Sequence, residues 1–130
     1  MVPYSGTIRP RVVRFDPGHT LIRLRDRRRV RNHLSSIHAI ALANLGELAT
    51  GLALIGSLGS GTRGILLGLE VEYLKKARGT VEAEARCDIS PVDGPLDMLV
   101  EARIRDFDGD VVAVTRAQWR LAPSPERTHR

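Results

Sequence analysis

The stretch Ile37–Ile55, with the sequence IHAIALANLGELATGLALI, decides the fold of this chain. A stripe of apolar side chains recurs in it at spacings of four, four, three, four and three residues, which is the period of an α-helix. The stripe consists of Ile37, Ala41, Leu45, Leu48, Leu52 and Ile55. Other faces also carry apolar residues, and a helix that is apolar all round is usually buried. The stretch therefore predicts one long core helix, with Ser35 or Ser36 as its N-cap.

Two glycines interrupt this helix. Gly46 and Gly51 each cost about 1 kcal/mol relative to alanine in a helix interior. A small side chain must therefore be needed at both positions. We expect a sheet to pack closely against the helix there.

Segments with a period of two surround the helix. Residues 11–15 and 19–24 flank the turn Asp16–Gly18 and predict a hairpin. After the glycine-rich connection 56–64, four alternating segments follow, each with one apolar face. These faces consist of Leu67, Leu69, Val71 and Tyr73; Val81, Ala83, Ala85 and Cys87; Met98, Val100, Ala102 and Ile104; and Val111, Ala113, Thr115, Ala117, Trp119 and Leu121. Tight turns are predicted at 77–79 and 107–110.

This order of elements predicts an α+β fold, in which an antiparallel sheet of about six strands wraps around one long central helix. We expect a single domain at 11–121, between a flexible N-terminus at 1–10 and a disordered tail at 122–130. One helix on one sheet leaves edges and a second face open. A symmetric homodimer is the usual remedy, and a homotetramer stays an open alternative.

The charge of the chain is concentrated in its first quarter. The 130 residues have a net charge of +5; residues 1–31 hold nine arginines and two aspartates (+7), and the rest hold 11 basic and 13 acidic residues (−2). This bias favours an anionic partner. An aromatic content of only 4% counts against a surface that stacks nucleic-acid bases.

Other classes of protein are excluded by what the sequence lacks. The single cysteine, Cys87, excludes an intrachain disulfide, and the scattered histidines predict no metal site. We expect His19 and His129 to be solvated. Without a signal-peptide pattern or about 18 uninterrupted apolar residues, we expect a cytoplasmic protein.

Glu47 is the candidate for chemistry, because a carboxylate in an apolar helix is costly to bury unless it is paired or functional. An exposed or structurally hydrogen-bonded glutamate is the alternative, and the commoner one. His38 lies nine residues earlier, on the opposite side of the same helix. The two side chains could meet across a two-fold axis, which would create two equal sites at a dimer interface.

The helix N-terminus is the second candidate component of a catalytic site. Its free N–H groups near Ala39 and Ile40 can polarise a carbonyl and hold a developing oxyanion. A carboxylate opposite them could act as a general base for water or attack directly. Such a site suits a carbonyl compound with an activated leaving group.

The run Asn32-His33-x4-His38-Ala39-x-Ala41-x2-Asn44-x2-Glu47 resembles the motif of hotdog-fold acyl-CoA thioesterases. The phenylacetic-acid-pathway type is the most similar enzymatic group, beside a less characterised hotdog subgroup. The segment Glu70–Gly79 also resembles the strand that follows their helix, so that the likeness spans roughly residues 10–121. The His-Gly-Gly of those enzymes is His38-Ala39-Ile40 here.

The resemblance implies a hotdog fold and roles for four residues. Glu47 would be the base or nucleophile, and the Ala39 amide would form the oxyanion hole. Asn32 would position the water or the thioester carbonyl, and His38 would shape the helix start. His33 either lines the site or is a plain loop histidine.

Three functions remain open from the sequence. The first is hydrolysis of an acyl-CoA, with Arg28, Arg29 and Arg31 binding the phosphates of coenzyme A, which enters as part of the substrate without a further cofactor. The second is a non-catalytic module that binds or senses acyl-CoA. The third and weakest is nucleic-acid binding through the arginine-rich loop 25–31.

Overall fold

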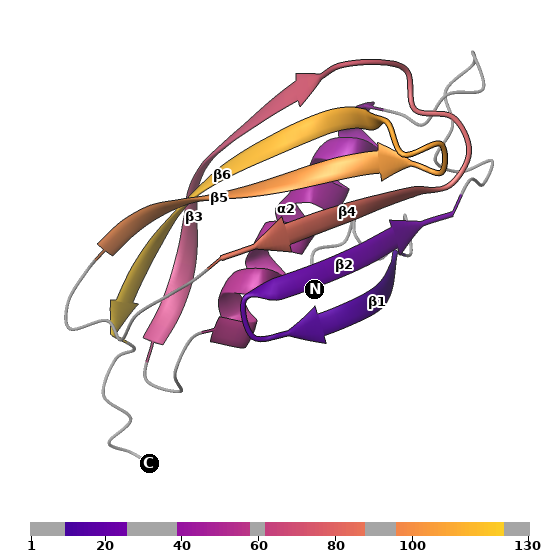
Figure 1. Ribbon diagram of the computed structural model, residues 1–130. Coiled ribbons are helices and arrows are strands. Elements are labelled where there is room, and N and C mark those ends of the chain that lie inside the picture. The colour runs from indigo at the N-terminus through magenta and orange to yellow at the C-terminus, as the bar shows by residue number, and fades with distance from the viewer. Residues whose placement is uncertain (1–9, 26–38, 58–61, 88–95, 124–130) are drawn as a thin grey trace.

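The structure is a computed structural model that describes residues 10–25, 39–57, 62–87 and 96–123. Within these residues it contains one helix and six strands, labelled as in Figure 1. In chain order they are β1 (Arg11–Asp16), β2 (His19–Leu24), α2 (Ala39–Ser57), β3 (Thr62–Tyr73), β4 (Val81–Arg86), β5 (Leu96–Asp106) and β6 (Val111–Pro123). The strands form a single antiparallel sheet in the order β1-β2-β4-β5-β6-β3. The predicted α+β architecture is confirmed.

Close packing of α2 against the sheet explains one of the two helix glycines directly. A Cβ atom on Gly46 would lie 2.0 Å from Oγ1 of Thr115 on β6, which is well inside contact distance. On Gly51 the nearest atom would be Cζ2 of Trp119, at 3.3 Å. The helix backbone therefore lies directly on β6 at Gly46, as predicted, whereas the neighbour of Gly51 is the side chain of Trp119. By length and a mean hydropathy of 1.6, Ala39–Gly56 could also cross a membrane, but in this fold it packs against the strands.

The sheet covers only one side of α2, as Figure 1 shows. Ala41, Leu45 and Ala49 are fully buried against the strands. On the uncovered side, Ile40 is 59% exposed and Ile55 is 61% exposed. The chain's own sheet therefore covers only part of the apolar surface of the helix.

A β-bulge changes the predicted alternation of β3. The register with β6 shifts between Leu66 and Gly68, so that Leu66 pairs with Trp119 and Leu69 with Ala117. An extra residue in a strand reverses the facing of the residues before it. Leu67 is thus out of phase with Leu69, Val71 and Tyr73, contrary to the predicted shared face. β3 also begins at Thr62, within the predicted connection, and β6 continues to Pro123.

His19 is not solvated, contrary to the expectation. Its Nε2 atom lies 2.6 Å from Oε2 of Glu84 on the neighbouring strand β4, and its side chain is only 14% exposed. The hydrogen bond from His19 lowers the pKa of Glu84. This pair joins the N-terminal hairpin to the rest of the sheet. His129 lies outside the described residues.

Candidate functional site

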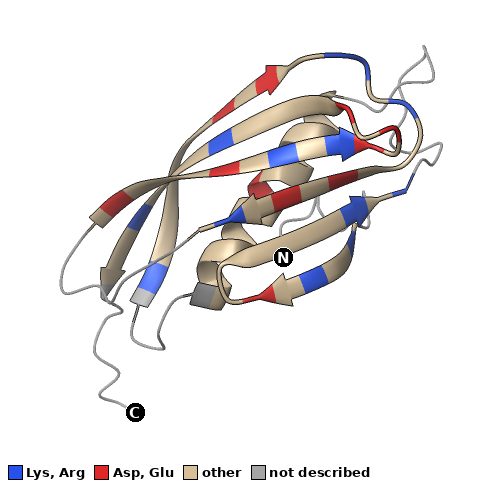
Figure 2. Cartoon of the chain, in the orientation of Figure 1, with Lys and Arg blue, Asp and Glu red and all other residues tan. Residues whose placement is uncertain are grey.

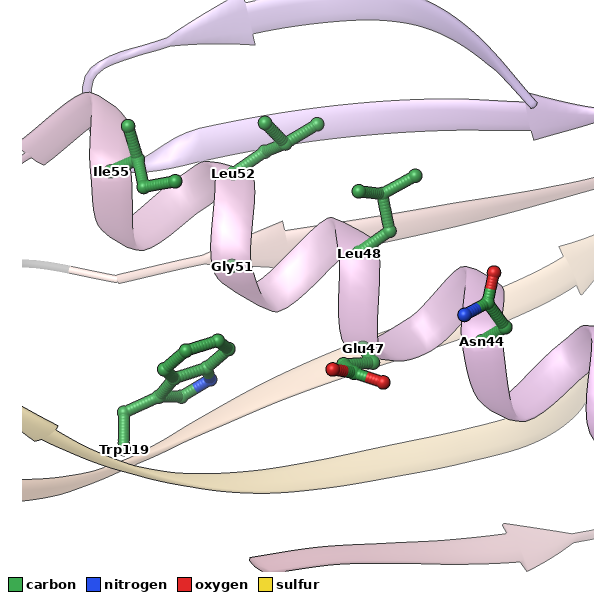
Figure 3. A pocket seen from close by; sticks show the side chains of 7 residues that line it. All are labelled: Asn44, Glu47, Leu48, Gly51, Leu52, Ile55 and Trp119. Carbon is green, nitrogen blue, oxygen red and sulfur yellow. The ribbon is translucent and has the colours of Figure 1, made fainter. Parts of the chain in front are cut away.

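A groove runs along the uncovered face of α2 (Figure 3). It has a volume of about 170 Å³ and is lined mainly by apolar side chains. Its lining residues are Asn44, Glu47, Leu48, Gly51, Leu52 and Ile55 of α2 and Trp119 of β6. Among them Glu47 is the only ionisable residue. The residue selected from the sequence therefore lies in the groove, half-buried.

The Glu47 carboxylate lies on the same side of α2 as the ring of Trp119 (Figure 3). Asn44, one helical turn earlier, flanks it on the other side. Within the described part of the chain, no lysine, arginine or histidine forms an ion pair with this carboxylate. A carboxylate so placed can accept a proton from a molecule that enters the groove.

Thr50 connects the turn that carries Glu47 to the sheet. The Thr50 hydroxyl donates a hydrogen bond to the backbone carbonyl of Glu47 at 2.9 Å, and it accepts one from Nε1 of Trp119 at 3.2 Å. Thr50 is fully buried, so water does not compete with either bond. These roles of Thr50 and Trp119 were missed in the sequence, because the contact joins residues 69 positions apart.

Ala39 is the first described residue of α2 and is exposed. The hydroxyl of Tyr73 on β3 donates a hydrogen bond to its carbonyl oxygen at 2.9 Å. Burial raises the pKa of Tyr73 above its ordinary value of 10.0, and at neutral pH this hydroxyl is a protonated donor in either case. Ala39 and Glu47 are eight residues apart, which corresponds to about 12 Å along a helix axis. One chain therefore does not bring the Ala39 amide and the Glu47 carboxylate to the same reacting group.

The other predicted site residues are not placed. Asn32, His33 and His38 lie outside the described residues, as do the arginines proposed to bind phosphate. Those arginines are Arg28, Arg29 and Arg31. Their predicted roles stay predictions.

Charges of both signs alternate on the strands, as Figure 2 shows. Arg23 pairs with Glu82 at 2.6 Å, and Arg120 pairs with Asp97 at 2.8 Å. The bond from Arg120 lowers the pKa of Asp97. The described strands therefore do not present the single-sign surface that nucleic-acid binding favours.

The helix and its six-stranded antiparallel sheet define a hotdog-fold protein, and solved structures agree. A protein of unknown function from Pseudomonas aeruginosa, described as a probable thioesterase, matches 94% of this chain and 88% of its own with a TM-score of 0.86 at 24% identity. A thioesterase from Haemophilus influenzae matches 97% of this chain and 87% of its own, with a TM-score of 0.81 at 17% identity. A protein from Streptococcus mutans, solved bound to acetyl-CoA, matches 90% of this chain and 91% of its own, with a TM-score of 0.73 at 18% identity.

Within this class the chain belongs to a particular family. The family described as Domain of unknown function (DUF4442) matches residues 1–121. A structural-genomics protein is 33% identical, with a TM-score of 0.86 over 94% of this chain and 82% of its own. No curated protein matches the sequence significantly.

Proposed function

We propose that this protein is an acyl-CoA thioesterase in which Glu47 is the catalytic carboxylate. The observation that carries the proposal is the position of Glu47, which alone among the described residues lining an apolar groove on the open face of the hotdog helix is ionisable. Neighbours of the same fold that are described as thioesterases, and one that is bound to acetyl-CoA, support this substrate class.

In the proposed reaction, the Glu47 carboxylate accepts a proton from water, and the resulting hydroxide adds to the thioester carbonyl carbon. The C–S bond then breaks, and the coenzyme A thiolate takes the proton from Glu47. The products are a carboxylic acid and free coenzyme A. In the alternative route the carboxylate itself adds to the carbonyl carbon, expels the thiolate and forms a mixed anhydride that water hydrolyses.

The remaining groups would stabilise and position the reacting thioester. The Ala39 amide at the helix N-terminus would hold the oxyanion. Asn32 would position the water or the carbonyl, and His38 would shape the helix start. The phosphates of coenzyme A would bind Arg28, Arg29 and Arg31.

A second copy of the chain would complete the site, because Ala39 and Glu47 are about 12 Å apart along one helix. β3 is an edge strand, and three of its apolar side chains are 37–45% exposed. They are Ile65, Leu67 and Leu69. Pairing of two such edges would extend the sheet and place the two helices side by side on one face of it. We propose this homodimer as the active form, with a tetramer made of two such dimers as the alternative.

The test measures thiol release from short, long and aromatic acyl-CoA substrates by the wild type and by Glu47→Gln. The variant keeps the shape of the side chain and removes its basicity, so we expect turnover to fall by roughly 10²–10⁴-fold. Glu101→Gln, on the outer surface of β5 at 39% exposure, is the matched control and should turn over like the wild type. Undiminished turnover by Glu47→Gln would overturn the assignment. Saturable acyl-CoA binding without thiol release by the wild type would favour the non-catalytic module.

A further inference from the structure

The groove continues past Glu47 along the helix. Gly51 lies one turn further, about 6 Å along the axis. Leu48, Leu52 and Ile55 lie on one side of it and Trp119 on the other (Figure 3). Gly51 carries no side chain, so a ligand with its carbonyl at Glu47 can extend directly over the helix backbone between these two apolar walls.

The Trp119 wall is held in place. A methyl group on Gly51 would lie 3.3 Å from Cζ2 and 3.4 Å from Cη2 of the indole, so the edge of the ring borders the slot above this glycine. From the same edge, the ring donates its Nε1–H to the neighbouring Thr50 at 3.2 Å. Because Thr50 is fully buried, a rotation of the indole away from the groove would leave both groups without this bond.

We propose that Gly51 and Trp119 determine acyl-group specificity and select a compact apolar acyl group of about six carbon atoms. We take the size from the part of the groove that one chain forms, which has a volume of about 170 Å³. An apolar protein cavity of about 150 Å³ binds one benzene molecule. The chemistry follows from the lining, which beyond Glu47 and Asn44 is apolar. This inference rests on the proposed function in one respect: it takes the thioester carbonyl to lie at Glu47.

Binding can be tested without turnover, because Trp119 is the only tryptophan of the chain. Hexanoyl-CoA, dodecanoyl-CoA and free coenzyme A are titrated into Glu47→Gln while tryptophan emission is recorded. We expect hexanoyl-CoA to change the emission saturably, dodecanoyl-CoA to bind at least about tenfold more weakly, and free coenzyme A to leave the emission unchanged. The same response to coenzyme A alone, or equal affinity for the two acyl chains, overturns the inference. Emission changes without any thiol release by the wild type would refute the thioesterase and leave the acyl selectivity intact.

Substitutions in the slot provide the second test. Gly51→Ala adds one methyl group between Glu47 and Trp119, and one methylene in an apolar pocket changes discrimination by about tenfold or more. We expect affinity for hexanoyl-CoA to fall about tenfold relative to acetyl-CoA. The matched control is Gly56→Ala, whose methyl would lie 3.1 Å from Cε1 of Phe15, and Gly56 does not line the groove. An unchanged hexanoyl-to-acetyl ratio in a folded Gly51→Ala protein contradicts the assignment.

Trp119→Leu removes the wall and makes the test independent of whether Gly51→Ala folds. We expect the binding preference of this variant to move toward dodecanoyl-CoA. Because the variant lacks the tryptophan emission, binding is measured by competition against a fluorescent acyl-CoA. A chain-length preference identical to that of the wild type would show that Trp119 does not limit the acyl group.

Discussion

Replacement of Gly46 by alanine probes how closely the helix lies on the sheet. The new Cβ atom would be 2.0 Å from Oγ1 and 2.6 Å from Cβ of Thr115, and Thr115 is fully buried. Non-bonded carbon atoms at their best separation are about 3.5–4.0 Å apart. α2 and β6 would therefore have to move apart by about 1 Å or more at this point.

The expected loss of stability combines two opposing effects. Overpacking a core typically costs about 1–3 kcal/mol, and the upper end applies because both neighbours are rigid: a helix backbone and a β-branched side chain on a strand paired on both sides. The higher helix propensity of alanine, worth about 1 kcal/mol relative to glycine, offsets part of this cost. The net loss is about 2 kcal/mol in the free energy of unfolding. At about 4 °C per kcal/mol for a chain of this size, Tm should fall by about 8 °C.

Urea unfolding followed by far-UV circular dichroism, at one fixed protein concentration, measures this loss. Gly68→Ala is the matched control, because its Cβ would have no neighbour within 4 Å. Thr115→Ala removes the 2.0 Å contact, so Gly46→Ala should be less damaging in that background, with a coupling energy above about 0.5 kcal/mol. A Gly46→Ala protein as stable as the wild type would refute the close packing inferred here.

Two further predictions concern other parts of the fold. The hydrogen bond from Lys75, at 3.0 Å, lowers the pKa of Asp106 below its ordinary 3.8. The ionised Asp106 therefore contributes fully to stability above pH 3.8, and this contribution is lost as the pH falls through the lowered pKa. Asp106→Asn should therefore flatten the acid limb of unfolding free energy against pH, and unchanged slopes would contradict this. Leu67→Lys places a charge on the exposed β3 edge, where we expect little effect on the stability of the folded monomer. In analytical ultracentrifugation the variant should have a mass nearer 14.3 kDa, the mass of one chain, than twice that value. A wild type that sediments as a monomer at all concentrations would overturn the proposed dimer.

Local signals predicted most of the fold. The turn at Asp16–Gly18 joins β1 and β2 as expected, with Gly18 at a φ of 76° that suits glycine. The phase of the helix and Gly46 within it correctly predicted close packing against a sheet, whereas Gly51 borders the groove beside Trp119. These features depend on residues near one another in the chain, and periodicity and turn chemistry report such features well.

Features that depend on strand register could not be predicted in the same way. Three such features depend on segments that are distant in the chain. They are the bulge at Leu67, the pairing of His19 with Glu84, and the bond from Trp119 to Thr50. The exposed Ile40 and Ile55 show a related limit, because an apolar helix face looks the same whether its own sheet or another chain covers it. Glu47 could be selected because a charge within an apolar helix is itself a local anomaly.

The position of β3 in the sheet has a consequence for the order in which the molecule can assemble during synthesis. β3 follows the helix directly, yet among the described strands it pairs with β6 alone, at residues Val111–Pro123. The ribosome therefore releases an apolar helix and an unpaired apolar strand well before the segment that can bind them, and domains generally complete folding as a unit. Because Trp119 lies on β6, the wall that it forms in the groove is synthesised only with the last strand. A chain stopped before residue 111 would thus lack both the partner of β3 and the Trp119 wall of the proposed acyl site.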